Sequence, residues 1–244
     1  MRPLIRLLLP VALAGALTCS ISQAAVQLSS TRVIMNEKDR NVSVFARNIE
    51  SQPIVVQAWI EGPAGEMKTP FFITPPLSRF DGGVERSLNI SRVDTDFPPD
   101  RESYYWVNIL EIPQKAETTA NSLALAMRTR IKLFYRPTAI KDAARGGDQL
   151  TWQLTHSLAG CEIHIANASP YTVNFAWIET PGGSKSFANG VIAMPLESTR
   201  VPLARCPAGG SLEAQPHVVN DYGATESWPA ILLKEGQAVT GTVQ

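Results

Sequence analysis

Apolar and polar side chains alternate along most of the chain, and this period of two is typical of β-strands rather than helices. Residues Asn41–Asn48 follow the alternation, with Phe45 as an exception. Residues Ile54–Glu61 and 104–112 are runs rich in Val, Ile, Tyr and Trp, which favour strands. Clusters of Gly, Pro and Asp separate these runs and mark turns. The pattern therefore predicts an all-β fold.

A short internal repeat divides the chain into two similar halves. The sequence A-W-I-E at residues 58–61 recurs at residues 176–179, and a similar polar, proline-containing turn precedes both copies. The offset of 118 positions suits an immunoglobulin-like β-sandwich of about 100 residues. Charged residues and glycines interrupt the apolar pattern at residues 141–148. We therefore predict two immunoglobulin-like domains, at residues 25–144 and 145–244.

The N-terminus has the features of an export signal. Two arginines precede an apolar run at residues 7–17 that is too short to span a bilayer. Small residues occupy the −3 and −1 positions before the bond that follows Ala24. We predict a signal peptide at residues 1–24 with cleavage after Ala24. A lipoprotein signal ending at Cys19 is the alternative, but the residues before Cys19 match it poorly.

The composition narrows the functional classes. The 244 residues are 44% apolar and carry 22 basic and 22 acidic side chains, so the chain is too apolar and too weakly charged to be disordered. Removal of the predicted signal would leave 20 basic against 22 acidic residues. Because there is no basic excess to bind a phosphate backbone, we expect no nucleic-acid partner.

Two cysteines, Cys161 and Cys206, lie in the predicted mature chain. An even pair in an exported protein predicts a disulfide. Cys161 would start a strand at residues 161–166 and Cys206 would end a strand at residues 199–206. The two Cβ atoms would meet if these are neighbouring antiparallel strands of a sandwich. A reactive thiol pair is the alternative, and the wide spacing does not suit a zinc site.

The sequence offers little catalytic chemistry. It contains no HExxH zinc motif, no GxSxG nucleophile elbow and no glycine-rich phosphate-binding loop. A hydrolase built on this scaffold would need an activated nucleophile, and none is evident. We therefore predict a protein that is not an enzyme, with no catalytic residues, no cofactor and no metal site.

A strand-like run at residues 122–137 combines an apolar stripe with a basic one. Large apolar residues share one parity and alternate with alanines, and cations follow on the opposite parity: Leu123, Leu125 and Met127, then Arg128, Arg130 and Lys132. One interpretation is a core strand with a solvated basic face. The other is an edge strand that presents its apolar stripe to a partner.

Several motifs together resemble one protein family. The segment I-K-L-F-Y-R-P at residues 131–137 is similar to that family's signature. Further matches are T-R-V at 31–33, T-P-P at 74–76, D-R-E-S at 100–103, E-I-P at 111–113 and N-D-Y-G at 220–223. In number, order and spacing they resemble the periplasmic chaperones of the chaperone–usher pilus pathway, the PapD/FimC-like family. The resemblance extends over nearly all of the predicted mature chain.

This resemblance implies a fold and a set of binding residues. The family has two immunoglobulin-like domains set at an angle with a cleft between them. It donates a strand to a pilin subunit whose own sandwich lacks one, and the donor residues would be Leu123, Leu125 and Met127. The subunit's C-terminal carboxylate would bind Arg32 and Lys132. Because Lys132 has the opposite parity from the donor residues, either a bulge or twist intervenes or the ammonium approaches from the other side.

The resemblance also implies an interdomain ion-pair network and a set of partners. Glu102, Arg136 and Asp221 match the network. The partners would be pilin or fimbrial subunits and an outer-membrane usher, in the periplasm, without membrane insertion of the mature chain. The competing hypothesis is an exported two-domain β-sandwich adhesin or structural pilus subunit.

Overall fold

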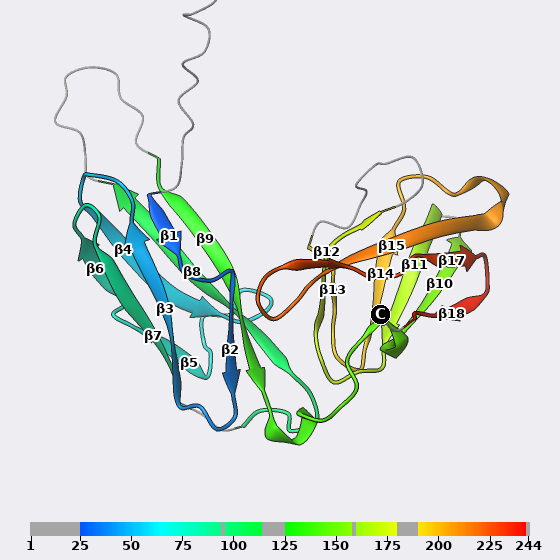
Figure 1. Ribbon diagram of the computed structural model, residues 1–244, viewed down its shortest axis with the longest axis horizontal. Helices are drawn as coiled ribbons and strands as arrows, with labels where there is room; N and C mark the ends of the chain where they lie inside the picture. The colour runs from blue at the N-terminus through cyan, green and yellow to red at the C-terminus, as the bar shows by residue number, and fades with distance from the viewer. Residues whose placement is uncertain (1–24, 94–95, 114–124, 158–159, 180–189, 243–244) are drawn as a thin grey trace, which may run out of the picture.

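The computed structural model describes residues 25–93, 96–113, 125–157, 160–179 and 190–242. Figure 1 shows two β-rich bodies side by side, with strands β1 to β9 in one and β10 to β18 in the other. No strand of one body pairs with a strand of the other within these ranges. The predicted signal peptide and the donor candidate Leu123 lie outside the described residues. In the described part of the chain, no helix has the length and apolar character needed to cross a membrane.

The first domain is a sandwich of two sheets. One sheet has the strand order β1-β3-β7-β5 and the other β2-β9-β8-β4-β6. The strands are β1 (Val26–Leu28), β2 (Arg32–Asn36), β3 (Asn41–Asn48), β4 (Ile54–Glu61), β5 (Phe71–Thr74), β6 (Leu77–Phe80), β7 (Glu85–Arg92), β8 (Ser103–Pro113) and β9 (Met127–Arg136).

Alternation along each strand builds the core of this domain. In β3, Val44 and Ala46 are fully buried, whereas Phe45 between them is exposed. In β9, Ile131 and Leu133 point into the same core. The side chains of opposite parity therefore lie on the outward face of the β2-β9-β8-β4-β6 sheet.

The second domain repeats the arrangement. Its sheets have the orders β14-β11-β10-β18 and β13-β12-β15-β16, with β17 also paired to β15. The strands are β10 (Leu150–Ser157), β11 (Gly160–Asn167), β12 (Val173–Glu179), β13 (Ile192–Ala193), β14 (Ser198–Pro202), β15 (Ser211–Val219), β16 (Thr225–Ser227), β17 (Ile231–Lys234) and β18 (Ala238–Thr240). Short 3-10 turns, η2 (Thr138–Ile140) and η3 (Gly147–Gln149), lie in the connection between the domains. The boundary between residues 144 and 145 stays a prediction.

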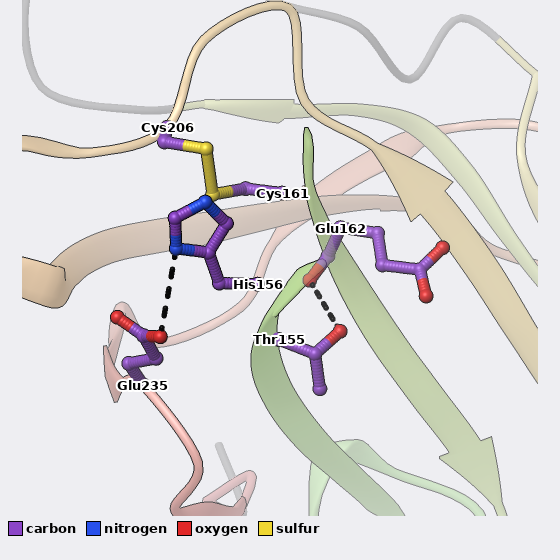
Figure 2. Close-up of a disulfide and its surroundings, with 6 residues drawn as sticks. All are labelled: Thr155, His156, Cys161, Glu162, Cys206 and Glu235. Atoms are coloured by element: carbon purple, nitrogen blue, oxygen red, sulfur yellow. Dashed lines mark hydrogen bonds and ion pairs between the residues drawn. A yellow bond between two sulfur atoms is a disulfide. The ribbon is translucent and has the colours of Figure 1, made fainter. Parts of the chain in front are cut away.

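A disulfide joins Cys161 and Cys206, with Cα atoms 5.2 Å apart (Figure 2). Cys161 lies in β11, but the expectation that Cys206 ends a strand is wrong. β14 ends at Pro202, and Cys206 lies in the irregular connection that follows. His156 lies close to both sulfur atoms. Because the sulfurs are bonded to each other, neither is a thiolate that could hold a metal with this histidine.

The strand expected at residues 122–137 is shorter than predicted. Leu125 and Ala126 precede β9 in irregular backbone, and pairing with β8 begins at Met127. From there the register with β8 is continuous as far as Tyr135. No bulge therefore interrupts β9, and Lys132 lies on the opposite face of the sheet from Met127.

Candidate functional site

Strand β9 has one edge that is only partly covered. Along one side it pairs with β8 over its length from Met127. Along the other side it pairs with β2, in parallel, from Lys132 to Arg136. Within the described residues, no strand pairs with residues 127–131 on that second side. This uncovered segment presents backbone N–H and C=O groups that another strand could use.

Arg32 and Lys132 lie at the closed end of this free edge. They are directly opposite each other in the parallel pair of β2 and β9, and both point to the outward face of the sheet. The Arg32 guanidinium lies over the Phe134 ring, with Cζ 5.6 Å from the centroid, and Nη1 donates a hydrogen bond of 2.9 Å to the Val219 carbonyl oxygen. The closed end therefore carries two neighbouring cations.

Both cations are partly removed from water. Burial lowers the pKa of Arg32 from its usual value, although the charge of Asp221 opposes the shift. Burial and the charge of Arg32 lower the pKa of Lys132 to about 8. The Nε of Arg32 is buried and has no hydrogen-bond partner among the described residues. A carboxylate bound here would give this donor a partner and would relieve the repulsion between the cations.

The apolar candidates Leu125 and Met127 lie at the other end of the free edge. Leu125 is 61% exposed and Met127 is 42% exposed. Together with Ile54, Glu111 and Pro113, among others, they line a shallow hollow of about 210 Å³. Exposed large apolar side chains beside an unpaired strand edge are features of a surface that a partner could cover.

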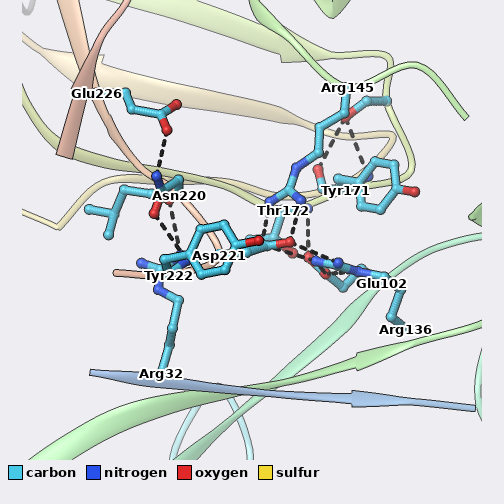
Figure 3. Close-up of polar contacts among 12 residues, drawn as sticks. Arg32, Glu102, Arg136, Arg145, Tyr171, Thr172, Asn220, Asp221, Tyr222 and Glu226 are labelled. Atoms are coloured by element: carbon cyan, nitrogen blue, oxygen red, sulfur yellow. Dashed lines mark hydrogen bonds and ion pairs between the residues drawn. The ribbon is translucent and has the colours of Figure 1, made fainter. Parts of the chain in front are cut away.

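The three predicted interdomain residues are in direct contact (Figure 3). Arg136 in β9 donates to Glu102 Oε1 at 2.8 Å and to Asp221 Oδ2 at 2.9 Å. Glu102 Oε2 accepts the backbone N–H of Thr172 in the second domain. This network joins the end of β9 to two segments of the second domain.

Hydrogen bonds and opposite charges favour the ionised forms of Arg136 and Asp221. Burial alone would lower the pKa of Arg136, but the hydrogen bonds and charges of Asp221 and Glu102 raise it above its usual value. Burial alone would raise the pKa of Asp221, but hydrogen bonds from Arg145 and Arg136 hold it well below its usual range. The side chains of Glu102 and Arg136 are 1% and 15% exposed, so the pair lies largely out of solvent.

Sequence reasoning missed Arg145 and Tyr171. Arg145 donates two hydrogen bonds to Asp221, at 2.7 and 2.6 Å. The Tyr171 ring lies near both guanidinium groups, with Cζ of Arg136 and Arg145 at 5.2 and 5.0 Å from its centroid. In the sequence, Arg145 is one charged residue in a polar connection, and only the folded chain brings it to Asp221.

A turn after β15 brings Asp221 to this position. Asn220 Oδ1 accepts the backbone N–H groups of Tyr222 and Ala224 and so closes the turn. Gly223 has a φ of +84°, which favours glycine. Its Cα approaches Thr31 of the first domain so closely that a Cβ would clash. The N-D-Y-G motif thus supplies a turn residue and a close contact between domains as well as a charge.

The chain thus has two β-sandwich domains joined by an ion-pair network, and one uncovered strand edge of the first domain ends at two cations. Family models agree with this architecture. The model described as "Pili and flagellar-assembly chaperone, PapD N-terminal domain" matches residues 25–141, and "Pili assembly chaperone PapD, C-terminal domain" matches residues 147–229. The chain belongs to the PapD family of pilus-assembly chaperones, a family that is not enzymatic.

Individual relatives are similar over most of their length. The probable fimbrial chaperone LpfB of Escherichia coli O157:H7 is 36% identical over 88% of this chain and 91% of its own. Chaperone protein FimC of Escherichia coli K12 is 31% identical over 83% of this chain and 82% of its own.

Solved structures show the same two-domain fold. The YadV chaperone structure has a TM-score of 0.70 and 27% identity, and the match covers 86% of this chain and all of that one. A chain in the structure of the Salmonella enterica SafA pilin in complex with the SafB chaperone also has a TM-score of 0.70. It is 25% identical, and the match covers 88% of this chain and 98% of that one.

Proposed function

We propose that this chaperone captures fimbrial subunits by pairing with them along the free edge of β9. Arg32 and Lys132 bind the C-terminal carboxylate of the subunit, and the apolar stripe of Leu123, Leu125 and Met127 fills a groove in its incomplete sandwich. The complex forms in the periplasm, and an outer-membrane usher receives the subunit. The supporting observation is the free edge at residues 127–131 that ends at two cations.

The closed end of the edge favours a chain terminus over an internal segment. Beyond Lys132 the position beside β9 is occupied by β2, so a partner strand that continued past Lys132 would collide with Arg32 and the residues after it. A strand that ends there can run in either direction. Two cations favour a carboxylate end over an ammonium end, which makes the partner strand parallel to β9.

The chemistry of the two cations suits this role. A guanidinium can bind a carboxylate through two parallel hydrogen bonds, and an ammonium adds a compact charge. Arg32 is already oriented by Phe134 and by the Val219 carbonyl, so little side-chain freedom is lost on binding. The anchor also sets the register of the partner, because a one-residue slip would turn the apolar stripe away from the groove.

The apolar stripe would supply much of the affinity. Burial of each large apolar side chain contributes roughly 1.5–3 kcal/mol. Leu125 and Met127 are exposed in the free protein, so their burial would be a net gain on binding. Met127 and Lys132 lie on opposite faces of β9, so the partner's sandwich would close over one face while its terminus is bound at the other.

The network of Glu102, Arg136 and Asp221 would hold the two domains at the angle that the subunit requires. Its role is structural, since the described contacts of these side chains are with one another, with Arg145, with the Tyr171 ring and with the Thr172 backbone.

The proposed location and delivery step rest on the predicted signal peptide and on family membership. One related structure, with a TM-score of 0.63 and 26% identity, is described as a periplasmic chaperone. The proposed cycle of capture and release needs no nucleotide, because assembly of the subunits with each other can drive their release from the chaperone. Family membership also favours a chaperone over the competing hypothesis of an adhesin or structural pilus subunit.

Substitution of the two cations tests this proposal. Arg32→Ala and Lys132→Ala should each abolish co-purification of a co-expressed fimbrial subunit, while the circular dichroism spectrum stays close to that of the wild type. Arg79→Ala is a matched control, because Arg79 is an exposed cation on the far edge of the same sheet, paired with Asp81. Normal subunit yield with both cation variants would refute the anchor.

A further inference from the structure

The outward face of β9 continues away from Lys132 as a row of cations that lie over indole rings. Cζ of Arg130 is 4.4 Å from the centroid of Trp106, and Nζ of Lys132 is 5.2 Å from the same centroid. Cζ of Arg128 is 4.9 Å from the centroid of Trp59. The rings come from β8 and β4, which are the next strands of the sheet (Figure 1).

In the part of the chain that the structure describes, one carboxylate, Glu61, lies against this row. Its two oxygens already accept hydrogen bonds from neighbouring side chains. It accepts a hydrogen bond from Trp59 Nε1 at 2.8 Å and bonds from Arg128 Nη2 at 2.7 and 2.8 Å. Arg128 also donates to Asn108 Oδ1. The guanidinium donors of Arg128 are thus largely hydrogen-bonded within the first domain.

Arg130 differs from Arg128 in this respect. Its contact with Glu61 is longer, 3.3 Å, and is made to an oxygen that Arg128 already binds. Its side chain is 39% exposed. A guanidinium that lies over an aromatic ring is held in place, yet its N–H donors remain available for a carboxylate. Arg130 therefore belongs to the free-edge segment of β9, while its guanidinium is held over Trp106 of the neighbouring strand β8 and keeps unused donors.

We propose that Arg130 is a specificity residue that selects an acidic side chain near the C-terminus of the strand that pairs with β9. The inference rests on the proposed function, because it places the partner strand along residues 127–131. Arg128 and Lys132 on either side increase the positive potential, and Trp106 holds the guanidinium in place. The partner is thus a subunit whose terminal strand carries Asp or Glu at an outward-facing position.

Strand geometry restricts where that acidic residue lies. Residues two apart on a strand are about 6.6 Å apart and share a face. If the terminal carboxylate lies at Lys132, the backbone next to Arg130 belongs to residues about two positions earlier. Directly opposed Cβ atoms on neighbouring strands lie about 5 Å apart, so an ion pair needs an acidic side chain long enough to reach across β9 towards the guanidinium over Trp106. Moving the acidic residue by one position would turn it to the other face.

Synthetic peptides provide a direct test with the full chaperone. The probes are peptides of about ten residues that alternate apolar and polar positions and end in a free carboxylate. They carry Glu, Gln or Lys at either the third or the second residue from the C-terminus. Each peptide is also made with an amidated C-terminus. Isothermal titration calorimetry at low and high salt gives the affinities.

The wild-type protein should bind the Glu peptide roughly fivefold more tightly than the Gln peptide, and the Lys peptide more weakly still. This preference should occur at one of the two adjacent positions and should shrink at high salt. Arg130→Gln should abolish the preference for Glu, and Arg130→Lys should keep part of it. Arg79→Gln removes the same charge from the far edge of the sheet and should leave the preference unchanged.

The outcomes separate this inference from the proposed function. If amidation weakens binding but wild type binds the Glu, Gln and Lys peptides equally, the role of Arg130 is overturned and the carboxylate anchor stands. An equal preference for Glu at both adjacent positions, or a preference that survives Arg130→Gln, also overturns it. If amidation has no effect, or no peptide binds, the anchor and the role of Arg130 both fail.

Discussion

Arg32 and Lys132 are directly opposite each other at the first pairing position between β2 and β9. Each comes from a different part of the chain, and both are on the outward face of the sheet. Two like charges at such close range are unfavourable in a free protein. The lowered pKa of Lys132 reflects burial and this repulsion. The proposed carboxylate ligand would offset the repulsion between these two cations.

Subunit binding should depend on pH above about 8. The pKa of Lys132 is about 8 in the free protein, and a bound carboxylate would raise it. Below pH 8 both states hold the proton and affinity is constant. Above pH 8 the free protein loses the proton that the complex keeps, so affinity falls by up to about tenfold per pH unit. Titrations between pH 6 and 10 measure this, and Lys132→Arg should flatten the profile. A flat wild-type profile would contradict the anchor.

Lys132→Met should stabilise the free protein while it abolishes binding. The lowered pKa means that protonated Lys132 is less favourable in the folded than in the unfolded state. This cost is present below pH 8 and disappears as pH rises towards the usual range of lysine. After allowance for solvent screening, the free energy of unfolding should increase by about 1 kcal/mol at pH 7. Urea unfolding at pH 7 and pH 10 checks this, since the gain should shrink at pH 10.

Arg136→Gln should destabilise the domain interface more than Arg145→Gln. Removal of Arg136 leaves Glu102 buried without its cation, which costs about 3 kcal/mol. Arg145 is 36% exposed, so its loss should cost about 1 kcal/mol. Urea unfolding gives both values. Small-angle scattering reports the distribution of angles between the two domains, and this distribution should broaden for Arg136→Gln. Equal effects of the two substitutions would argue against the central position of Arg136.

Replacement of both cysteines by serine should weaken the second domain without loss of subunit capture. The disulfide joins residues 45 positions apart, and its removal increases the freedom of the unfolded chain. The expected loss is about 2–4 kcal/mol in the free energy of unfolding, measured in guanidinium. Binding should stay within about twofold of the wild type, because the proposed site is in the first domain. A large loss of binding would place part of the site in the second domain.

Leu125→Asp and Met127→Asp should each weaken subunit capture at least tenfold, since a carboxylate would then enter an apolar groove. Both side chains are exposed in the free protein, so the unfolding midpoint should change little. Phe45→Asp, at an exposed apolar position in the other sheet, is the matched control. Unchanged affinity for Leu125→Asp and Met127→Asp would argue against strand donation.

Much of the fold could be predicted because each strand carries its own pattern. The run Ile54–Glu61 was expected from its composition and is β4, and the exposed Phe45 is the exception within Asn41–Asn48 that the alternation identifies. The end of β14 was not predictable in this way, since residues 203–206 leave the sheet although they follow a strand-like run. Local pattern determines that a strand forms but does not determine its last residue.

The candidate site was less predictable, because it depends on which strands become neighbours. The cation Arg32 and the cation Lys132 are 100 positions apart, and only the parallel pairing of β2 with β9 brings them together. The continuous register of β9 answers the question of parity, as Lys132 is on the outward face. Arg145 reaches Asp221 through the path of the interdomain connection, which no periodicity in the sequence encodes.

The position of β2 at the end of the free edge restricts when a subunit could be captured. In the proposed complex, Arg32 and Lys132 recognise a polypeptide end, and β2 blocks any continuation of the strand. A subunit that is still being exported has no accessible C-terminus, so it could not yet bind in this way. Capture would be a late event that follows complete translocation. By the same logic, a purification tag added after the subunit's last residue would prevent its recognition.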